Sequence, residues 1–264
     1  DTVAATWSQI HGVAADYGVA VGDLNGDGID EVFMARSVGG VSKYDFTTSL
    51  TTTVNPNAAD KIATGDLDGN GTDEIVMSFT GAGIGTYAYY GATAVKISSA
   101  HAGQLATGDI DGDGNDEVFF SFSGFCTYVN QGLLGGYYLI SSVYSDLGLL
   151  GADIDGDGDD EAIFNFSAYG IYANNGVLNA NTVINGLGAQ QLAAGDADGD
   201  GKEELLASWT GVGTYKVVYG GTNLKITSVE SESLAVVAVP EPATLGLFVL
   251  VGSGMLWMRK RFTI

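Results

Sequence analysis

A chain of 264 residues with 40 glycines and only 3 prolines has room for one folded domain, and it needs many tight turns, which is typical of short β-strands. Its 32 acidic residues outnumber its 10 lysines and arginines, and the resulting net charge of −22 argues against a nucleic-acid partner, because two polyanions repel each other. Cys126 is the only cysteine, which excludes an intramolecular disulfide, so packing, hydrogen bonds or a metal ion must hold the fold.

A nine-residue acidic motif recurs five times along the chain. The copies begin at Asp23, Asp66, Asp109, Asp153 and Asp196, at intervals of 43, 43, 44 and 43 residues. These five windows contain 24 of the 32 acidic residues, so most of the negative charge sits in five short segments. So many neighbouring carboxylates would repel one another strongly unless a cation lies among them. We number the positions of each motif from 1 to 9, starting at its first aspartate.

The spacing within the motif indicates calcium as this cation. Side-chain oxygens at positions 1, 3 and 5 can converge if the chain curls, and the glycine at position 6 allows the sharp turn that brings the position 7 carbonyl inward. The invariable glutamate at position 9 then supplies the last ligand. Oxygen ligands alone favour a hard cation, and a flexible site with many ligands favours Ca²⁺ over Mg²⁺. We expect about five calcium ions. The predicted ligands are Asp23, Asn25, Asp27, Ile29 and Glu31; Asp66, Asp68, Asn70, Thr72 and Glu74; Asp109, Asp111, Asp113, Asn115 and Glu117; Asp153, Asp155, Asp157, Asp159 and Glu161; and Asp196, Asp198, Asp200, Lys202 and Glu204.

Two other interpretations of the motif fail. An EF-hand loop needs a bidentate glutamate at position 12, but that position is apolar in all five copies. The residues there are Met34, Met77, Phe120, Phe164 and Ala207. An acidic turn that binds nothing would not repeat the same oxygens and glycine five times. The acid at position 8 points to the opposite side of the emerging strand, so we expect it to be a group behind the ligands or one that faces solvent.

The segments between the motifs have the pattern of short strands. Each motif is followed by a run rich in β-branched and aromatic residues, such as 31–36 or 74–79, and is preceded by a run of small residues, such as 61–65. Two further runs, at 86–90 and 95–99, flank Gly91 in the second repeat. Four short strands in about 43 residues are typical of a propeller blade. The sequence therefore predicts an all-β propeller of about five four-stranded blades over residues 1–238.

The repeated run Gly-Asp-x-Asp-Gly-Asp-Gly-x-Asp-Glu, followed by an apolar strand, resembles the FG-GAP/VCBS type of repeat over roughly residues 16–236. Members of that family include the calcium-bearing blades of integrin α-chain propellers and some polysaccharide lyases. The resemblance implies a propeller that holds Ca²⁺ in the loop between the first and second strands of each blade. Many such repeats have Asp at position 9, where this chain always has Glu, and many such propellers have seven or eight blades.

The ends of the chain suggest how the ring of blades closes. Projected back by one repeat, residues 7–11 fall in the phase of an outermost strand, and residues 224–228 form a second candidate for that strand in the last blade. One of the two is surplus. We expect residues 7–11 to complete the fifth blade and residues 224–228 to join the stalk, because this pairing fastens the ring and covers an exposed edge.

Residues 239–264 form a segment of different character. Sixteen uncharged residues, 243–258, follow a Pro-Glu-Pro motif and precede a basic cluster, which predicts an apolar helix whose basic end stays in the cytoplasm. This order resembles the PEP-CTERM sorting signal. The motif residues are Pro240, Glu241, Pro242, Arg259, Lys260 and Arg261. The resemblance implies export by a Gram-negative-type bacterium, transient anchoring in the inner membrane, cleavage by an exosortase-type enzyme, and delivery to the cell surface or an extracellular matrix. A plain membrane anchor is the alternative, and in either case we expect a signal peptide to have been removed before Asp1.

The sequence offers no set of residues for catalysis. Only seven lysines and arginines precede residue 239, and His11 and His101 are isolated, so a base or charge neutraliser for acidic sugars is missing. We therefore expect a non-enzymatic surface or matrix protein that acts in adhesion or in glycan or protein binding. The alternatives are an accessory or degenerate lyase-like module and a purely structural matrix component. Aromatic residues at matched positions, Phe79, Phe122 and Phe166, favour packing over sugar stacking. Arg36 and Trp209 replace phenylalanine there, so they are speculative ligand-binding residues.

Overall fold

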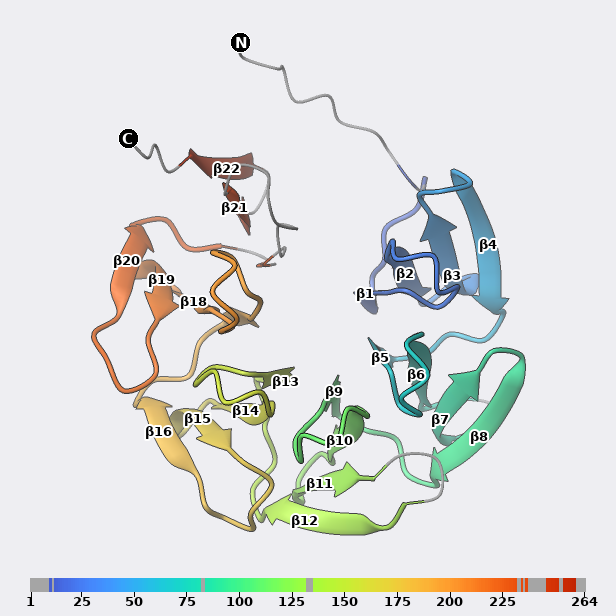
Figure 1. The fold of residues 1–264 in the computed structure, drawn as a ribbon, viewed down its shortest axis with the longest axis horizontal. Coiled ribbons are helices and arrows are strands. Elements are labelled where there is room, and N and C mark those ends of the chain that lie inside the picture. Colours follow the sequence, from blue (N-terminus) through green and yellow to red (C-terminus); the bar gives the residue numbers. More distant parts are fainter. Residues whose placement is uncertain are drawn as a thin grey trace. The chain divides into compact units, whose positions relative to one another are not determined.

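The computed structural model describes residues 10, 12–81, 84–131, 135–231, 234 and 236, and the backbone of residues 246–251 and 254–259. Five four-stranded antiparallel sheets account for most of them, and in each sheet the strands lie side by side in chain order (Figure 1). The predicted all-β propeller of five four-stranded blades is therefore confirmed. The chain divides into two compact units, Asp1–Ala102 with blades 1 and 2 and Gly103–Ile264 with blades 3 to 5.

The first unit contains the first eight strands. Blade 1 consists of β1 (Gly18–Gly22), β2 (Glu31–Arg36), β3 (Gly40–Asp45) and β4 (Leu50–Asn55). Blade 2 consists of β5 (Lys61–Gly65), β6 (Glu74–Phe79), β7 (Gly85–Tyr90) and β8 (Thr93–Ser98). Each acidic motif fills the loop between the first and second strands of its blade, and its position 9 glutamate begins the second strand in blades 1 to 4 and directly precedes it in blade 5.

The second unit repeats this plan three times. Blade 3 consists of β9 (Gln104–Gly108), β10 (Glu117–Ser121), β11 (Thr127–Asn130) and β12 (Tyr137–Ser141). Blade 4 consists of β13 (Gly148–Ala152), β14 (Glu161–Phe166), β15 (Gly170–Asn174) and β16 (Thr182–Asn185). Blade 5 consists of β17 (Gln191–Ala193), β18 (Leu205–Trp209), β19 (Gly213–Val217) and β20 (Leu224–Thr227).

The second strand of each blade is its most buried element. All six residues of β6 and all six of β14 are buried, whereas four of the six residues of the fourth strand β4 are exposed. A strand covered on both faces is apolar along its whole length, which explains the continuous apolar runs after the motifs. The hydrophobic core lies between neighbouring blades: Phe33 packs in one cluster with Met77 in the first unit, and Phe119 packs with Phe164 in the second.

Every blade has the same irregularity between its third and fourth strands. The register shifts there by one residue in all five sheets, which increases the local twist of the outer strand. The third strand often begins with a glycine in the left-handed region, such as Gly40 (φ 73°) and Gly170 (φ 105°). A Cβ at these positions would lie 2.1 Å from the carbonyl oxygen of Asn55 or Asn185, so the close approach of the fourth strand requires glycine.

Buried polar side chains fix the chain where it leaves the outer strand for the next blade. The Ser78 hydroxyl accepts a hydrogen bond from the Ala102 N–H at 2.8 Å, and the Ser121 hydroxyl accepts one from the Ser145 N–H at 2.8 Å. In blade 4, Asn165 binds both the N–H and the carbonyl of the corresponding residue, Ala189. A repeated hydrogen bond thus anchors the segment that leaves the outer strand to the second strand of the same blade.

The fifth blade corrects our expectation for the ends of the chain. Residues Leu224–Thr227 form β20 and pair with β19, in the register Thr214↔Thr227, so they are the outer strand of that blade and not part of a stalk. Residues 224–227 follow β19 closely in the chain, so they reach its free edge by the shortest connection. The expected N-terminal strand at 7–11 lies outside the described residues, apart from Ile10, whose carbonyl accepts a 3.3 Å hydrogen bond from Thr51.

The C-terminal segment forms a hairpin instead of the expected apolar helix. Strands β21 (Gly246–Val251) and β22 (Gly254–Arg259) pair with each other in an antiparallel register. Periodicity does not separate a short apolar helix from a strand, and a run rich in valine and aromatic residues between glycines favours the strand. Among the described residues, no helix is long and apolar enough to span a membrane. Pro240, Glu241, Pro242, Lys260 and Arg261 lie outside the described residues.

Candidate metal-binding loops

The backbone of the five acidic loops has the curl that the motif predicts. The glycine at position 6 lies in the left-handed region in every loop, with φ between 82° at Gly28 and 99° at Gly158. The glycine at position 4 does the same, for example Gly26 with φ 72°. Residues with a Cβ rarely adopt this conformation, so two glycines two residues apart are what let the loop turn twice within nine residues.

Three hydrogen bonds recur in all five loops and orient the side chains. The position 1 carboxylate accepts from the N–H of position 6 at 2.8–3.1 Å. The position 5 side-chain oxygen accepts from the N–H of position 7 at 2.9–3.1 Å. The position 9 carboxylate accepts from the N–H of position 2 at 2.9–3.1 Å. Each of these three side chains is thus held by backbone and keeps a second oxygen or lone pair for another partner.

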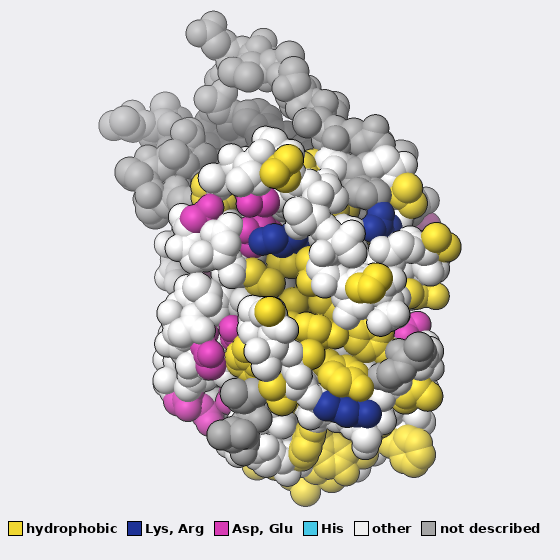
Figure 2. All heavy atoms as spheres, turned by 90° about the vertical axis from the view of Figure 1, so that its right-hand side faces the viewer, with side chains coloured by type: hydrophobic (Ala, Val, Ile, Leu, Met, Phe, Trp, Pro, Cys, Tyr) yellow, Lys and Arg dark blue, Asp and Glu magenta, His cyan; other side chains and the backbone are white. Residues whose placement is uncertain are grey.

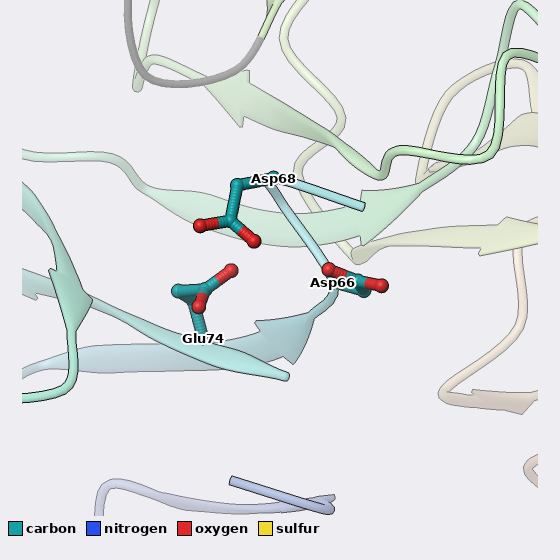
Figure 3. A group of neighbouring side chains, drawn as sticks. All are labelled: Asp66, Asp68 and Glu74. Atoms are coloured by element: carbon teal, nitrogen blue, oxygen red, sulfur yellow. The ribbon is translucent and has the colours of Figure 1, made fainter. Parts of the chain in front are cut away.

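Four loops bring the carboxylates of positions 1, 3 and 9 together. In each of these loops one oxygen from each of the three residues lies within 4.8 Å of the others. The triads are Asp66, Asp68 and Glu74; Asp109, Asp111 and Glu117; Asp153, Asp155 and Glu161; and Asp196, Asp198 and Glu204. Figure 3 shows the three carboxylates of blade 2 pointing toward one another. Because Ca–O distances are about 2.3–2.6 Å, oxygens this close can all reach one ion.

Three of the position 9 glutamates, those of blades 2, 3 and 4, have strongly raised pKa values. Burial, followed by repulsion from the position 3 aspartate, raises the pKa of Glu74 to about 7 and the pKa of Glu117 to about 8. The same causes raise the pKa of Glu161 to about 7. A buried carboxylate with a raised pKa is unfavourable in its charged form, and a cation among the three oxygens would offset that cost. The donor set therefore fits a hard divalent ion.

The first loop differs from the other four. Its position 3 residue is Asn25, and its amide donates to Glu31. The loop therefore offers carboxylates only from positions 1, 5, 8 and 9. From the sequence we expected the Asn25 amide to serve as a ligand in the same way as a carboxylate. In the structure this amide is hydrogen-bonded to Glu31 within the loop.

The position 8 acids of blades 2 and 4 contact the loop of the preceding blade. The carboxylate of Asp73 in blade 2 accepts a 2.9 Å hydrogen bond from the N–H of Asp23, and the Asp73 N–H donates to the Asp23 carbonyl at 2.9 Å. Asp160 makes the same pair of bonds with Asp109, at 3.0 and 2.6 Å. Burial raises the pKa of Asp160 to about 6. We expected the position 8 acid to lie behind the ligands or to face solvent. Asp73 and Asp160 lie behind the ligands, and they link one loop to the next.

Arg36 and Trp209, the speculative ligand-binding residues, lie in the interior of their blades. Both are buried, with 8% of each residue exposed. Arg36 donates to Ser42, and Trp209 packs edge-to-face against Tyr215 at 5.7 Å between ring centroids and donates to the Leu187 carbonyl. The corresponding pairs of blades 2 to 4 also meet edge-to-face. They are Phe79–Tyr87, Phe122–Tyr128 and Phe166–Tyr172. The matched aromatics therefore pack within the blades, and little of Arg36 or Trp209 is left exposed for a ligand to contact.

Together, the fold and the loops define a class of protein, a five-bladed β-propeller with acidic, metal-competent loops between the first and second strands. Solved structures share the fold. BBS1N in its complex with ARL6DN is 12% identical with a TM-score of 0.58, over 88% of this chain and 74% of that one. The extracellular domain of a one-component system of B. thetaiotaomicron is 14% identical with a TM-score of 0.51, over 88% of this chain and 32% of that one.

A third likeness is weaker. The V. cholerae biofilm matrix protein Bap1 is 23% identical over 72% of this chain and 34% of that one, but its TM-score of 0.37 is too low to support an inference. No family model matches the sequence, and the comparison with curated proteins finds no match either.

Proposed function

We propose that this chain is an exported, non-catalytic propeller that binds calcium and acts at a cell surface or in an extracellular matrix, in adhesion or in glycan or protein binding. The observation that carries the proposal is the convergence of three carboxylates in each of four loops. Oxygen-only loops without a bidentate glutamate at position 12 suit the weak affinities of extracellular calcium modules, for which dissociation constants are about 10⁻⁴–10⁻³ M. The resemblance to FG-GAP/VCBS repeats supports the same ion.

Exposed apolar side chains at the turn between the second and third strands provide the surface for a ligand. Phe125 in blade 3 is 74% exposed and Tyr169 in blade 4 is 56% exposed. Figure 2 shows hydrophobic side chains exposed on one face of the molecule. Aromatic rings can stack on sugars or enter a protein interface, and these turns replace Arg36 and Trp209 as the candidate contacts.

Binding to matrix polymers tests this function. The full-length protein with calcium should bind members of a glycan array or cosediment with the polysaccharide of its host's matrix. The double variant Phe125→Ser/Tyr169→Ser should bind at least about tenfold more weakly, since loss of an aromatic anchor costs about 2 kcal/mol or more. Phe46→Ser is the matched control, because Phe46 is also exposed but lies in the turn between the third and fourth strands.

The alternatives give other outcomes. Absence of any glycan or protein ligand would favour a purely structural matrix component. Release of unsaturated products from uronate-containing polymers would instead favour the accessory lyase-like module, and the non-catalytic assignment would then be withdrawn.

The support for export and sorting is the sequence of residues 239–264, which resembles a sorting signal. We propose that an exosortase-type enzyme cleaves the chain near Pro240–Pro242 and that the apolar segment holds it in the membrane until then. Mass spectrometry of the protein taken from the host's surface should give the mass of a chain that ends near this motif. A surface form that retains the sequence up to Ile264 would favour a plain anchor.

A further inference from the structure

Two lysines occupy equivalent places in the first and last blades. In each blade, one residue of the third strand pairs with the residue that lies two positions after the position 9 glutamate, in the second strand. In blade 1, Phe33 pairs with Lys43, and in blade 5, Leu206 pairs with Lys216. Blades 2, 3 and 4 have fully buried apolar residues at this register position, namely Ala88, Val129 and Ala173.

Both lysines reach the acidic loop of their own blade. The Lys216 ammonium lies 2.8 Å from Oε1 of Glu204 and 3.8 Å from Oδ2 of Asp198, which are the position 9 and position 3 oxygens of the triad in loop 5. The Lys43 ammonium lies 3.2 Å from Oε1 of Glu31, at position 9 of loop 1. Each ammonium therefore contacts the oxygens that a metal ion in that loop would need.

The three middle blades have no lysine at this register position, and Lys202, which reaches loop 4, donates to the backbone carbonyl of Asp155 and not to a carboxylate. In loop 4 the corresponding oxygen, Oε1 of Glu161, accepts a 2.9 Å hydrogen bond from the neutral amide of Asn175. A neutral donor leaves the charge of the triad unchanged, whereas an ammonium cancels one of its three negative charges and occupies space between the carboxylates.

We infer that Lys43 and Lys216 are built-in counterions that replace calcium in blades 1 and 5, so that the protein binds three calcium ions, at the loops of blades 2, 3 and 4. The inference rests on the proposed calcium function and limits it, because the five repeats of the sequence imply five ions. Loop 1 is disabled twice, by Lys43 and by the amide at position 3, whereas loop 5 keeps a full triad and is disabled by Lys216 alone.

The number of bound ions tests the inference. Equilibrium dialysis of the full-length protein with radioactive calcium, with the free ion raised until binding saturates, should give three ions per chain. Lys216→Ala should raise the number to four. Lys43→Ala alone should leave it at three, and Lys43→Ala combined with Asn25→Asp should raise it to four.

Lys225→Ala is the matched control for the change in net charge. Lys225 belongs to the same blade as Lys216 but lies over the Tyr215 ring, 5.6 Å from its centroid, so its removal should leave the number at three. A second readout is thermal: in chelator, Lys216→Ala should unfold at a lower temperature than the wild type, because Glu204 loses its partner, and calcium should restore the loss.

The outcomes separate this inference from the proposed function. A wild-type protein that binds four or five ions would overturn the role of the lysines and leave calcium binding intact. A wild-type number of three that Lys216→Ala does not change would also overturn it. A protein that binds no calcium would remove both the inference and the proposed function.

Discussion

Removal of calcium from the full-length protein is expected to lower its unfolding midpoint by about 15–30 °C. A ligand that binds only the native state stabilises it by about 2.7 kcal/mol per site at a hundredfold excess over its dissociation constant, and three independent sites would contribute about 8 kcal/mol. A change of 1 kcal/mol moves the midpoint of a domain of this size by about 2–4 °C. Melting curves recorded by circular dichroism in excess calcium and in chelator measure the difference.

Magnesium and a single-site variant provide the controls for this experiment. Mg²⁺ demands a near-ideal octahedral geometry and gives up its water reluctantly, so it should restore only a small part of the loss. Glu117→Gln should remove about a third of the calcium effect, because it disables one triad of three. Midpoints that coincide with and without calcium would contradict the metal assignment.

The elements that the sequence predicted correctly are those encoded by local spacing. The 43-residue period, the apolar run after each motif and the glycines at fixed positions are all contiguous in the chain, and the four-stranded blades and curled loops follow from them. The convergence of positions 1, 3 and 9 in four loops is local in the same way, since the residues lie within nine positions of one another.

The features that the sequence could not predict depend on register between strands or between blades. Lys43 and Lys216 reach their loops only because the third strand pairs in one particular register with the second. The bond from Asp160 to Asp109 joins residues 51 positions apart and requires two blades to be packed. The burial of Arg36 and Trp209 could not be predicted either, because the side on which a strand residue is covered depends on the neighbouring blade, which no local pattern specifies.

Without calcium, the protein should become less stable as the pH rises from about 4.5 to 8. Burial raises the pKa of Glu74 and Glu161 to about 7 and the pKa of Glu117 to about 8. An unfolded glutamate has a pKa of about 4.3, so the folded state binds more protons than the unfolded state throughout this range. The free energy of unfolding therefore decreases as the pH rises through the window, and repulsion among the remaining carboxylates acts in the same direction.

Bound calcium should reverse this dependence, because the ion binds the deprotonated carboxylates and its affinity increases as they lose their protons. Melting of metal-free protein at pH 5 and pH 8 should show a decrease in the midpoint of roughly 10 °C, while the calcium-loaded protein should keep or raise its midpoint. Glu117→Gln should flatten the decrease. Asp45→Asn should not, because a hydrogen bond from the Thr48 N–H holds the pKa of Asp45 below its ordinary value, outside the window. A metal-free midpoint that rises between pH 5 and pH 8 would show that the buried glutamates are stabilised in their charged form by the protein alone, and the loops would then have no electrostatic need for an ion.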